Sequence, residues 1–328
     1  MIRPVHVVAS AITDLRAPTP EVTTAEMAFD VARAAVERSG LPRGSIGVTV
    51  SASSDMLEGR SFNFVRGLEA LGAHPAVHER HLEMDGAWAA YYAWLLIQTG
   101  EFDGALVVAW GKTSEGSTAR VLNTRLDPFV LAPLGLDDVA CAGLQADAFV
   151  ARAGLGVESI DEVAARAGRA PSDEIVASPL TRAHLPDLVD GACALVLSAG
   201  GEGPVIRGAD HRIEPGALGH RDLSRAVSAR AAAERARAMA GWDTRVDLAE
   251  VGSSYAHQEL MLREALALDG ERVNPSGGPM VADPIMATGL IRLAEAAARA
   301  GPGERALAHA ATGPAMQQNV VWLLEGAA

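Results

Sequence analysis

The strongest constraint on the fold is a helix-then-strand unit that occurs twice in the chain. Residues 85–97 begin with an aspartate and a glycine and then run apolar on nearly every side, which predicts a buried helix. Residues 104–111 form a short apolar run bounded by glycine, which predicts a buried strand. The same order returns in residues 285–296, a predicted helix that Asp283 and Pro284 precede, and in residues 305–313, a predicted strand. Two copies of so long a unit predict a chain built from two duplicated halves.

Two further pairs of segments repeat in the same order. Residues 45–54 and 246–255 predict equivalent strands, and residues 24–39 and 223–240 predict equivalent helices. Because predicted strands alternate with predicted helices throughout, the fold class is α/β with buried sheets.

A glycine-rich stretch, which is typical of a flexible hinge, lies between the two sets of repeated segments. We place the boundary in the glycine-rich stretch 199–204, which gives an N-terminal half of residues 1–199 and a C-terminal half of residues 200–328. Residues 112–160 contain two prolines and little periodicity, and we expect them to form a loop that covers the core as a lid.

Charge and cysteine content narrow the class of protein. The 328 residues include 28 Lys and Arg against 41 Asp and Glu, a net charge of -13, which argues against non-specific binding of nucleic acid. No apolar run approaches the ~20 residues of a membrane span. The first ten residues predict a strand rather than a signal peptide. With only Cys141 and Cys193, a disulfide framework is not expected, and we predict a cytoplasmic protein.

One group of residues has a spacing that suggests a metal site. His74, His78, Glu79 and His81 lie close together, but Pro75 interrupts the first turn and no second ligand cluster accompanies them. Because metal sites need three or four convergent ligands, we expect no metal here. No glycine-rich phosphate loop follows a predicted strand either.

Several motifs in the sequence, taken in their order along the chain, resemble those of the thiolase superfamily. Residues 274–278 (Asn-Pro-Ser-Gly-Gly), Asp283-Pro284 and residues 287–289 (Ala-Thr-Gly) resemble the thiolase motifs Asn-Pro-x-Gly-Gly, Gly-His-Pro and Ala-Thr-Gly. Residues 178–197 are similar to the segment that closes the first thiolase half, and residues 249–260 to a strand-to-helix segment of the second half. The nearest resemblance is to the sterol-carrier-type thiolases and bacterial lipid-transfer proteins.

This resemblance implies a fold and a ligand. It implies the five-layered α-β-α-β-α thiolase fold of two similar halves, a dimer, and the binding of coenzyme A as an acyl-CoA substrate. It also places four residues at positions expected to contact the cofactor, namely Ser253, Gly277, Gly278 and Gly313.

The sequence departs from the thiolase pattern at all four catalytic positions. Asp85 stands where the family has its nucleophilic cysteine, and Asp283 stands where it has the Gly-His-Pro histidine. Gly252 or Ser253 replaces an asparagine or histidine, and residues 311–313 (Ala-Thr-Gly) replace the late Cys-x-Gly motif. Since a carboxylate cannot replace a thiolate in forming a thioester-level acyl-enzyme, thiolysis through a covalent intermediate is not expected.

One hypothesis keeps the pocket and changes the reaction. Asp85 and Asp283 occupy matching positions in the two halves, so we expect them to converge as an acid/base pair in which like charges raise one pKa. Tyr255 would supply a hydrogen-bond donor and His257 a proton shuttle. Such a set suits retro-aldol cleavage of a β-hydroxyacyl-CoA, with donors stabilising the thioester enolate. Lipid-transfer relatives that are aldolases work with a small partner bearing a zinc ribbon and an OB-fold domain.

Two alternatives remain open at this point. Asp85 and Asp283 both precede predicted helices, where aspartate is a common N-cap; Tyr255 could fill the space of a phenylalanine, and His257 and His309 could be interior histidines. In that case the chain would be a catalytically silent subunit that pairs with a cysteine-bearing thiolase paralogue. A Ser253–His257–Asp85 triad lacks the Gly-x-Ser-x-Gly context and is not supported.

Overall fold

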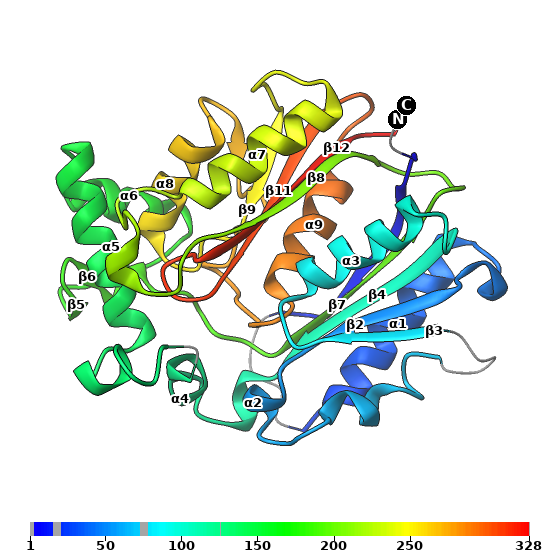
Figure 1. The fold of residues 1–328 in the computed structure, drawn as a ribbon, viewed down its shortest axis with the longest axis horizontal. Coiled ribbons are helices and arrows are strands. Elements are labelled where there is room, and N and C mark those ends of the chain that lie inside the picture. Colours follow the sequence, from blue (N-terminus) through cyan, green and yellow to red (C-terminus); the bar gives the residue numbers. More distant parts are fainter. Residues whose placement is uncertain (1–2, 16–20, 73–77, 125, 328) are drawn as a thin grey trace.

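The structure is a computed structural model that describes residues 3–15, 21–72, 78–124 and 126–327. Its main feature is a sheet of ten strands in the order β10-β9-β11-β12-β8-β1-β7-β4-β2-β3 (Figure 1). The first five strands along this order come from the C-terminal part of the chain and the other five from the N-terminal part. The two parts join between β1 and β8, where His6 pairs with Val205.

The two halves of the sheet have the same internal order. Counting outwards from the junction, β1-β7-β4-β2-β3 corresponds to β8-β12-β11-β9-β10. The elements of the N-terminal half are β1 (His6–Ile12), α1 (Thr24–Ser39), β2 (Val48–Ala52), α2 (Asp55–Glu58), β3 (His78–Leu82), α3 (Gly86–Gln98), β4 (Gly104–Gly111) and β7 (Gly191–Ser198). Those of the C-terminal half are β8 (Val205–Ile213), α7 (Val227–Ala240), β9 (Leu248–Val251), α8 (Ala256–Leu266), β10 (Arg272–Val273), α9 (Thr288–Arg299), β11 (Arg305–Thr312) and β12 (Gln318–Glu325).

This order matches the duplication read from the sequence. The predicted strand pair corresponds to β2 and β9, and the predicted helix pairs correspond to α1 with α7 and α3 with α9. One boundary was wrong: α9 begins at Thr288, five residues after Asp283, so Asp283 does not start this helix. The division at residues 199 and 200 falls in the connection between β7 and β8 and stays an interpretation of this topology.

Helices α3 and α9 form the central layer. They lie side by side between the two halves of the sheet, and one hydrophobic core contains residues of both helices and of both halves (Figure 1). Helix α1 covers the outer face of the N-terminal half, and α7 and α8 cover that of the C-terminal half. The result is five layers, α-β-α-β-α, which confirms the predicted fold class.

Small side chains allow the central helices to pack this closely. Ala87, Ala89, Ala90 and Ala93 of α3 are fully buried. A Cβ atom on Gly86 would lie 2.4 Å from the Cβ of Ala109 on β4, so only glycine fits where α3 enters the core. Close packing of this kind explains why the α3 sequence is apolar on nearly every side.

The segment between β4 and β7 is more regular than the sequence suggested. It contains α4 (Thr118–Asn123), α5 (Asp138–Ala153), α6 (Glu158–Arg166), β5 (Ile175–Ala177) and β6 (Leu180–Thr181). The expectation of a loop over residues 112–160 is therefore wrong for residues 118–123, 138–153 and 158–160, which are helical. Asp137 caps α5 through a hydrogen bond from the amide of Ala140, and Gly154 ends it in a left-handed conformation.

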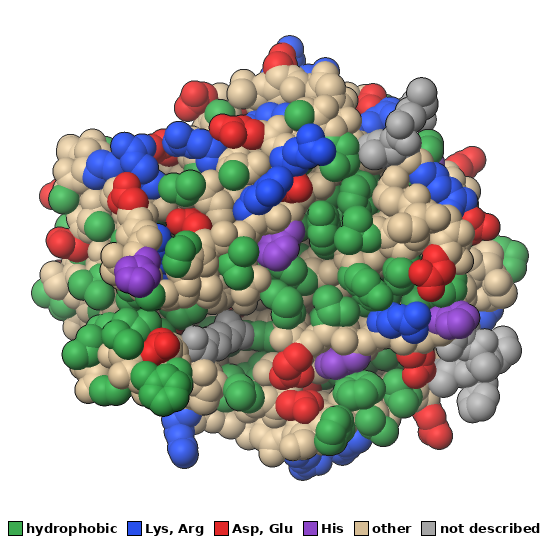
Figure 2. All heavy atoms as spheres, in the orientation of Figure 1, with side chains coloured by type: hydrophobic (Ala, Val, Ile, Leu, Met, Phe, Trp, Pro, Cys, Tyr) green, Lys and Arg blue, Asp and Glu red, His purple; other side chains and the backbone are tan. Residues whose placement is uncertain are grey.

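The surface mixes charges of both signs. Figure 2 shows acidic and basic side chains interspersed over one face rather than gathered by sign, with hydrophobic side chains across its middle. No described helix is both long and apolar enough to cross a lipid bilayer.

A buried ion pair fixes the motif at residues 274–278 to the central layer. Glu250 of β9 is fully buried; its carboxylate contacts Arg292 of α9 at 2.6 Å and accepts hydrogen bonds from the amide and hydroxyl of Ser276. Arg299 lies farther away, at 3.7 Å, with its side chain 39% exposed. This ion pair joins β9, the loop and α9 at one point.

We expect Arg292→Met to destabilise the protein by about 3–5 kcal/mol, because it leaves the Glu250 charge buried without its cation. Arg299→Met is the matched control and should cost less than about 1 kcal/mol, since the Arg299 side chain is partly solvated. Urea unfolding followed by circular dichroism measures both. Equal losses for the two variants would contradict this reading of the ion pair.

A second buried carboxyl group makes stability depend on pH. Burial raises the pKa of Glu58 on α2 to about 7, although the indole N–H of Trp110, 2.6 Å away, partly opposes the rise. Because the folded protein binds this proton more tightly than the unfolded chain does, the favourable contribution is full below pH ~4.5 and is lost as pH rises to 7.

Glu58→Gln should therefore stabilise the protein more at pH 8 than at pH 5, by roughly 2 kcal/mol. The amide keeps an oxygen for Trp110 but carries no charge that burial can penalise. Free energies of unfolding of both proteins at the two pH values give the comparison. A difference that does not change with pH would show that Glu58 is not protonated in the folded state.

Candidate functional site

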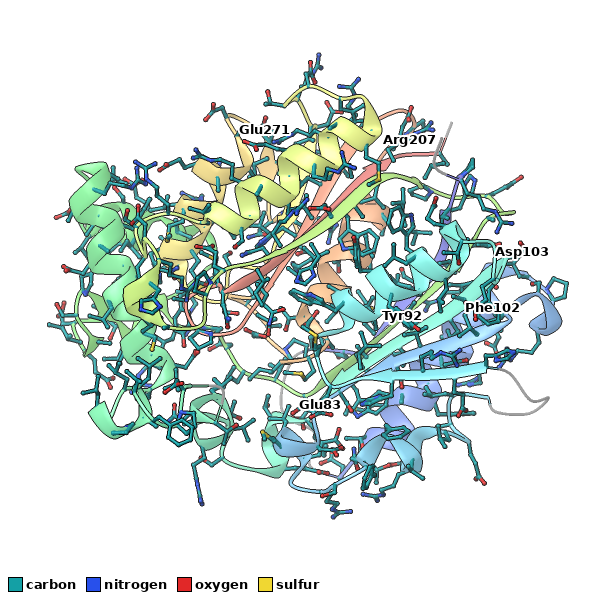
Figure 3. All side chains as sticks on the ribbon, in the orientation of Figure 1. Glu83, Tyr92, Phe102, Asp103, Arg207 and Glu271 are labelled. Carbon is teal, nitrogen blue, oxygen red and sulfur yellow. The ribbon has the colours of Figure 1, made fainter. Side chains whose placement is uncertain are left out.

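A cavity of about 220 Å³ lies where α3 and α9 begin. It is at the carboxyl ends of parallel strands, since β2, β3 and β4 run the same way and β9 and β11 do so in the other half. Figure 3 shows Glu83, just after β3, at this end of the N-terminal half and Asp103, just before β4, at the opposite end. Polar residues in the lining include Asp85, Asp138, Ser254, Tyr255, Asp283, Thr288 and Thr312.

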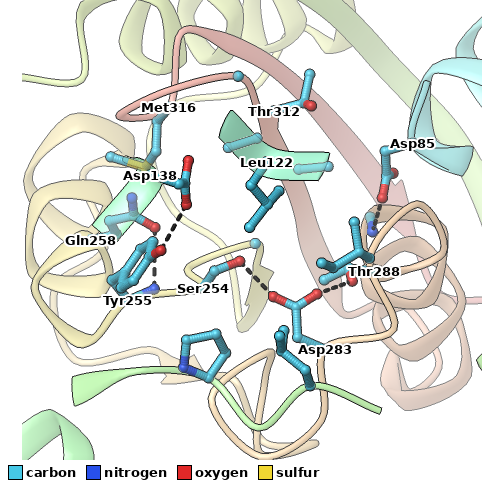
Figure 4. A pocket seen from close by; sticks show the side chains of 18 of the residues that line it. Asp85, Leu122, Asp138, Ser254, Tyr255, Gln258, Asp283, Thr288, Thr312 and Met316 are labelled. Carbon is cyan, nitrogen blue, oxygen red and sulfur yellow. Dashed lines mark hydrogen bonds between the residues drawn. The ribbon is translucent and has the colours of Figure 1, made fainter. Parts of the chain in front are cut away.

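Asp85 joins the two central helices. It is the N-cap of α3, and its Oδ1 accepts a hydrogen bond from the amide of Ala87 at 2.8 Å. Its Oδ2 accepts one from the amide of Gly289 in the first turn of α9, at 2.9 Å (Figure 4). The carboxylate thus lies at two helix N-termini at once, and both helix dipoles favour its negative charge.

Glycine at position 289 makes room for this contact. A Cβ atom there would lie 2.2 Å from Oδ1 of Asp85 and 2.5 Å from the Cβ of Ala310. The Ala-Thr-Gly motif read from the sequence therefore has a local reason: its last residue must let a carboxylate approach the helix backbone.

Asp283 is held in a different way. Its carboxylate accepts hydrogen bonds from the hydroxyl of Ser254, at 2.7 Å, and from the hydroxyl of Thr288 (Figure 4). Thr288 and Gly289 are consecutive residues of α9, and they bind Asp283 and Asp85 respectively. The structure therefore brings the two predicted aspartates to one wall of one cavity, although only Asp85 caps a helix.

Tyr255 also lines the cavity, and its partner is a residue that the sequence analysis missed. The Tyr255 hydroxyl donates to Asp138 of α5 at 2.7 Å, and burial together with the Asp138 charge raises the pKa of Tyr255 (Figure 4). The sequence analysis placed Asp138 in a loop, so neither helix α5 nor this contact was predicted. The contact joins residues that are 117 positions apart in the chain, and no local pattern records it.

The other predicted site residues lie elsewhere. His257 is fully buried behind the cavity wall, its Nε2 is 3.1 Å from Oε1 of Gln145, and burial lowers its pKa to about 3. A histidine that stays neutral and does not reach the cavity cannot act as the predicted proton shuttle. His309 is likewise an interior residue, paired with Asn319 at 2.8 Å.

Of the four predicted cofactor contacts, one lines the cavity. Gly313 does so, whereas Ser253, Gly277 and Gly278 are outside the lining. Gly277 and Gly278 have φ angles of 97° and 67°, so they serve the turn after Asn274 rather than the cavity. The side-chain oxygen Oδ1 of Asn274 fixes this turn to β9 by accepting a hydrogen bond from the backbone N–H of Val251 at 2.8 Å.

The residues suggested for a metal give no support for one. His78 and His81 lie on β3, and His74 is outside the described residues. Across the part of the chain that the structure describes, no group of three His, Cys, Asp or Glu side chains is placed to hold a metal ion.

Comparison with known proteins identifies the fold. Neither a protein-family model nor a curated protein sequence matches this chain. Human mitochondrial 3-ketoacyl-CoA thiolase is similar in structure, with a TM-score of 0.79 and 15% sequence identity over 99% of each chain. Acat5 thiolase from Ascaris suum, in a structure with coenzyme A, has a TM-score of 0.77 and 14% identity over 98% of this chain and 99% of its own.

The chain therefore has the thiolase fold over essentially its whole length. The resemblance noted in the sequence and the superposition of complete chains agree on this point. At such low identity the similarity is one of fold, and the chemistry must be argued from the residues of the cavity.

Asp85→Ala should destabilise the protein by about 3 kcal/mol, because it removes a helix cap and leaves the Gly289 amide buried without an acceptor. Asp85→Asn keeps one side-chain oxygen and should cost about 1 kcal/mol. Thermal and urea unfolding measure both.

The matched control is Asp137→Ala, which removes an exposed cap from α5 and should cost about 1 kcal/mol. If Asp85→Ala cost no more than this control, the carboxylate would not join α3 to α9 as described.

Proposed function

We propose that this chain binds acyl-CoA and makes or breaks a carbon–carbon bond in a CoA thioester by (retro-)aldol chemistry, without a covalent acyl-enzyme. The observation that carries this proposal is that Asp85 and Asp283, at the positions matched to the thiolase nucleophile and histidine, line one cavity. Two carboxylates in different surroundings at one site are a recurrent basis for acid/base catalysis.

The cysteines of the chain support a reaction without a thiolate. Cys141 and Cys193 are both buried, and burial raises the pKa of Cys141 to about 11 and that of Cys193 further. Neither lines the cavity. A nucleophilic thiolate of the thiolase kind is therefore not part of the proposed mechanism.

The hydrogen-bond partners of the two aspartates support different roles for them in the proposed reaction. Asp283 is held by hydroxyls, which can donate to a carboxylate and can rotate to accept from a carboxylic acid. Asp85 is held by backbone amides, which can only donate. These partners suit Asp283 to exchanging a proton and Asp85 to remaining a carboxylate in the proposed reaction.

In the cleavage direction, Asp283 takes the proton of the β-hydroxyl group of the substrate. The Cα–Cβ bond breaks, the β-carbon leaves as a carbonyl compound, and the electron pair passes into the thioester as an enolate. A proton returned to Cα completes the reaction. Tyr255 already donates to Asp138, so we assign this pair to shaping the cavity wall rather than to proton transfer.

The replaced motifs support a proposal for the branch of the thiolases and for the partners of this chain. Loss of the cysteine and the histidine together supports a place in the sterol-carrier-type and lipid-transfer branch of the thiolases. By the same resemblance we propose a cytoplasmic homodimer or heterodimer that works with a zinc-ribbon and OB-fold partner. The acidic chain makes nucleic acid an unsuitable ligand.

The alternative is a catalytically silent subunit that completes a cysteine-bearing thiolase paralogue. The specific observation in its favour is that both oxygens of Asp85 are bound by helix amides. A carboxylate in that structural role needs no substrate. Purification from the native host distinguishes the aldolase-like enzyme from the silent subunit, since a silent subunit should copurify with a cysteine-bearing thiolase in equal amounts.

Asp283→Asn should abolish retro-aldol cleavage while leaving the protein folded, because an amide cannot take up the hydroxyl proton. Asp85→Asn should also abolish turnover, because it removes the like charge that, in the proposed acid/base pair, favours uptake of the hydroxyl proton by Asp283. The assay supplies β-hydroxyacyl-CoAs to the protein with its copurified partners, and follows the released carbonyl compound and shortened CoA thioester by chromatography.

Asp137→Asn, on the exposed surface of α5, is the control and should keep wild-type activity. Full activity in both Asp283→Asn and Asp85→Asn would mean that the carboxylate mechanism is wrong.

A further inference from the structure

A turn in the cavity wall holds a methionine in a backbone conformation that favours glycine. Residues 284–287 form this turn, which is closed by a hydrogen bond from the amide of Ala287 to Pro284 O at 3.0 Å. Met286 is its third residue and has a φ angle of 71°, the conformation that a type II turn requires at that position. Glycine adopts this conformation freely, whereas a residue with a side chain is strained in it.

The surroundings hold the turn from two sides. On one side, the amide of Gly86 in the first turn of α3 donates to Met286 O at 2.6 Å. On the other side, the end of β4 lies against the turn, where a Cβ atom on Gly111 would be 1.9 Å from Ile285 O. Met286 therefore cannot leave its strained conformation without disturbing these contacts.

The side chain of Met286 is explained by the cavity rather than by the turn. Met286 and Met316 both line the cavity and are both buried. Met316 also packs into the core beneath α7 and α8, whereas Met286 belongs to none of the hydrophobic cores of the described residues. Since glycine would satisfy the turn without strain, the methionine side chain has its place at the cavity.

The turn lies between the two aspartates of the site. Asp283 is three residues before Met286, and Gly86, which binds the Met286 carbonyl, directly follows Asp85. In the proposed reaction Asp283 receives the proton of the β-hydroxyl group, so the β-carbon of the substrate lies beside this turn.

We propose that Met286 is a specificity-determining residue that restricts the group on the β-carbon of the substrate to a short one. Its side chain occupies space that a longer acyl chain needs, in a cavity of about 220 Å³. The substrates are then short-chain β-hydroxyacyl-CoAs, and the carbonyl product is a small aldehyde or ketone. The inference rests on the proposed function, because it presumes that an acyl-CoA enters the cavity with its β-carbon at Asp283.

Two substitutions separate the bulk of the side chain from the strain of the turn. Met286→Ala removes the thioether chain but keeps a Cβ atom at a φ of 71°, whereas Met286→Gly removes both the bulk and the strain. The matched control is Met280→Ala, which makes the same truncation in the core shared by α5, α6 and α8, outside the cavity lining.

Calorimetry with unreactive saturated acyl-CoAs, from butyryl-CoA to decanoyl-CoA, measures the chain-length limit. Each buried methylene group tightens binding roughly fourfold, so affinity should rise with length until the acyl chain reaches Met286. We expect both Met286 variants to bind octanoyl-CoA about tenfold tighter than the wild type does, with less than about a threefold change for butyryl-CoA. Met280→Ala should keep the wild-type length preference.

Thermal unfolding gives a second readout, which tests the strain. Met286→Gly should melt about 2 °C higher than Met286→Ala, although its side chain is smaller, because glycine relieves the left-handed conformation. A lower melting temperature for Met286→Gly would contradict the strain on which the assignment of this residue rests.

Two outcomes of the binding series overturn the inference, and they differ in what else they overturn. If the Met286 variants keep the wild-type length preference, Met286 does not limit the acyl chain, but acyl-CoA binding stands. If neither the wild type nor the variants bind any acyl-CoA, the proposed function fails together with the inference.

Discussion

The contact between Asp85 and the amide of Gly289 is the constraint on which the rest of the site depends. One side chain caps α3 with one oxygen and binds the first turn of α9 with the other. Since these helices come from different halves of the chain, the contact fixes how the halves meet. It requires glycine at position 289, and it places a negative charge where two helix dipoles converge.

The five-layered architecture explains why the cavity forms at this end of the molecule. Parallel strands end where the helices that follow them begin, and ligands of open α/β sheets bind beyond the carboxyl ends of such strands. Duplication doubles this arrangement, so two sets of strand ends and two helix N-termini face one cavity. Helix α5 then closes it from the side, through Asp138 and its hydrogen bond to Tyr255.

The sequence predicted the fold better than the site, for physical reasons. Periodicity, caps and repeated order are local or repeated signals, and they were sufficient to pair α3 with α9 and β2 with β9. The placement of His257 behind the cavity wall and of Asp138 within it depends on how α5 packs against α8, which no local pattern records. The glycines at positions 277 and 278 were predicted to contact the cofactor because their motif resembles one of the thiolases. Their positive φ angles show that the turn itself requires glycine at these positions.

Duplication also explains how one fold can hold two aspartates with different properties. Asp85 is the N-cap of α3, whereas α9 begins five residues after Asp283 and has Ala287 at its N-cap. Asp283 therefore lies before its helix, where the hydroxyls of Ser254 and Thr288 bind its carboxylate. The two aspartates are thus bound by different groups: backbone amides, which donate, and hydroxyls, which can donate or accept. This difference in hydrogen-bond partners underlies the separate roles proposed for the two residues.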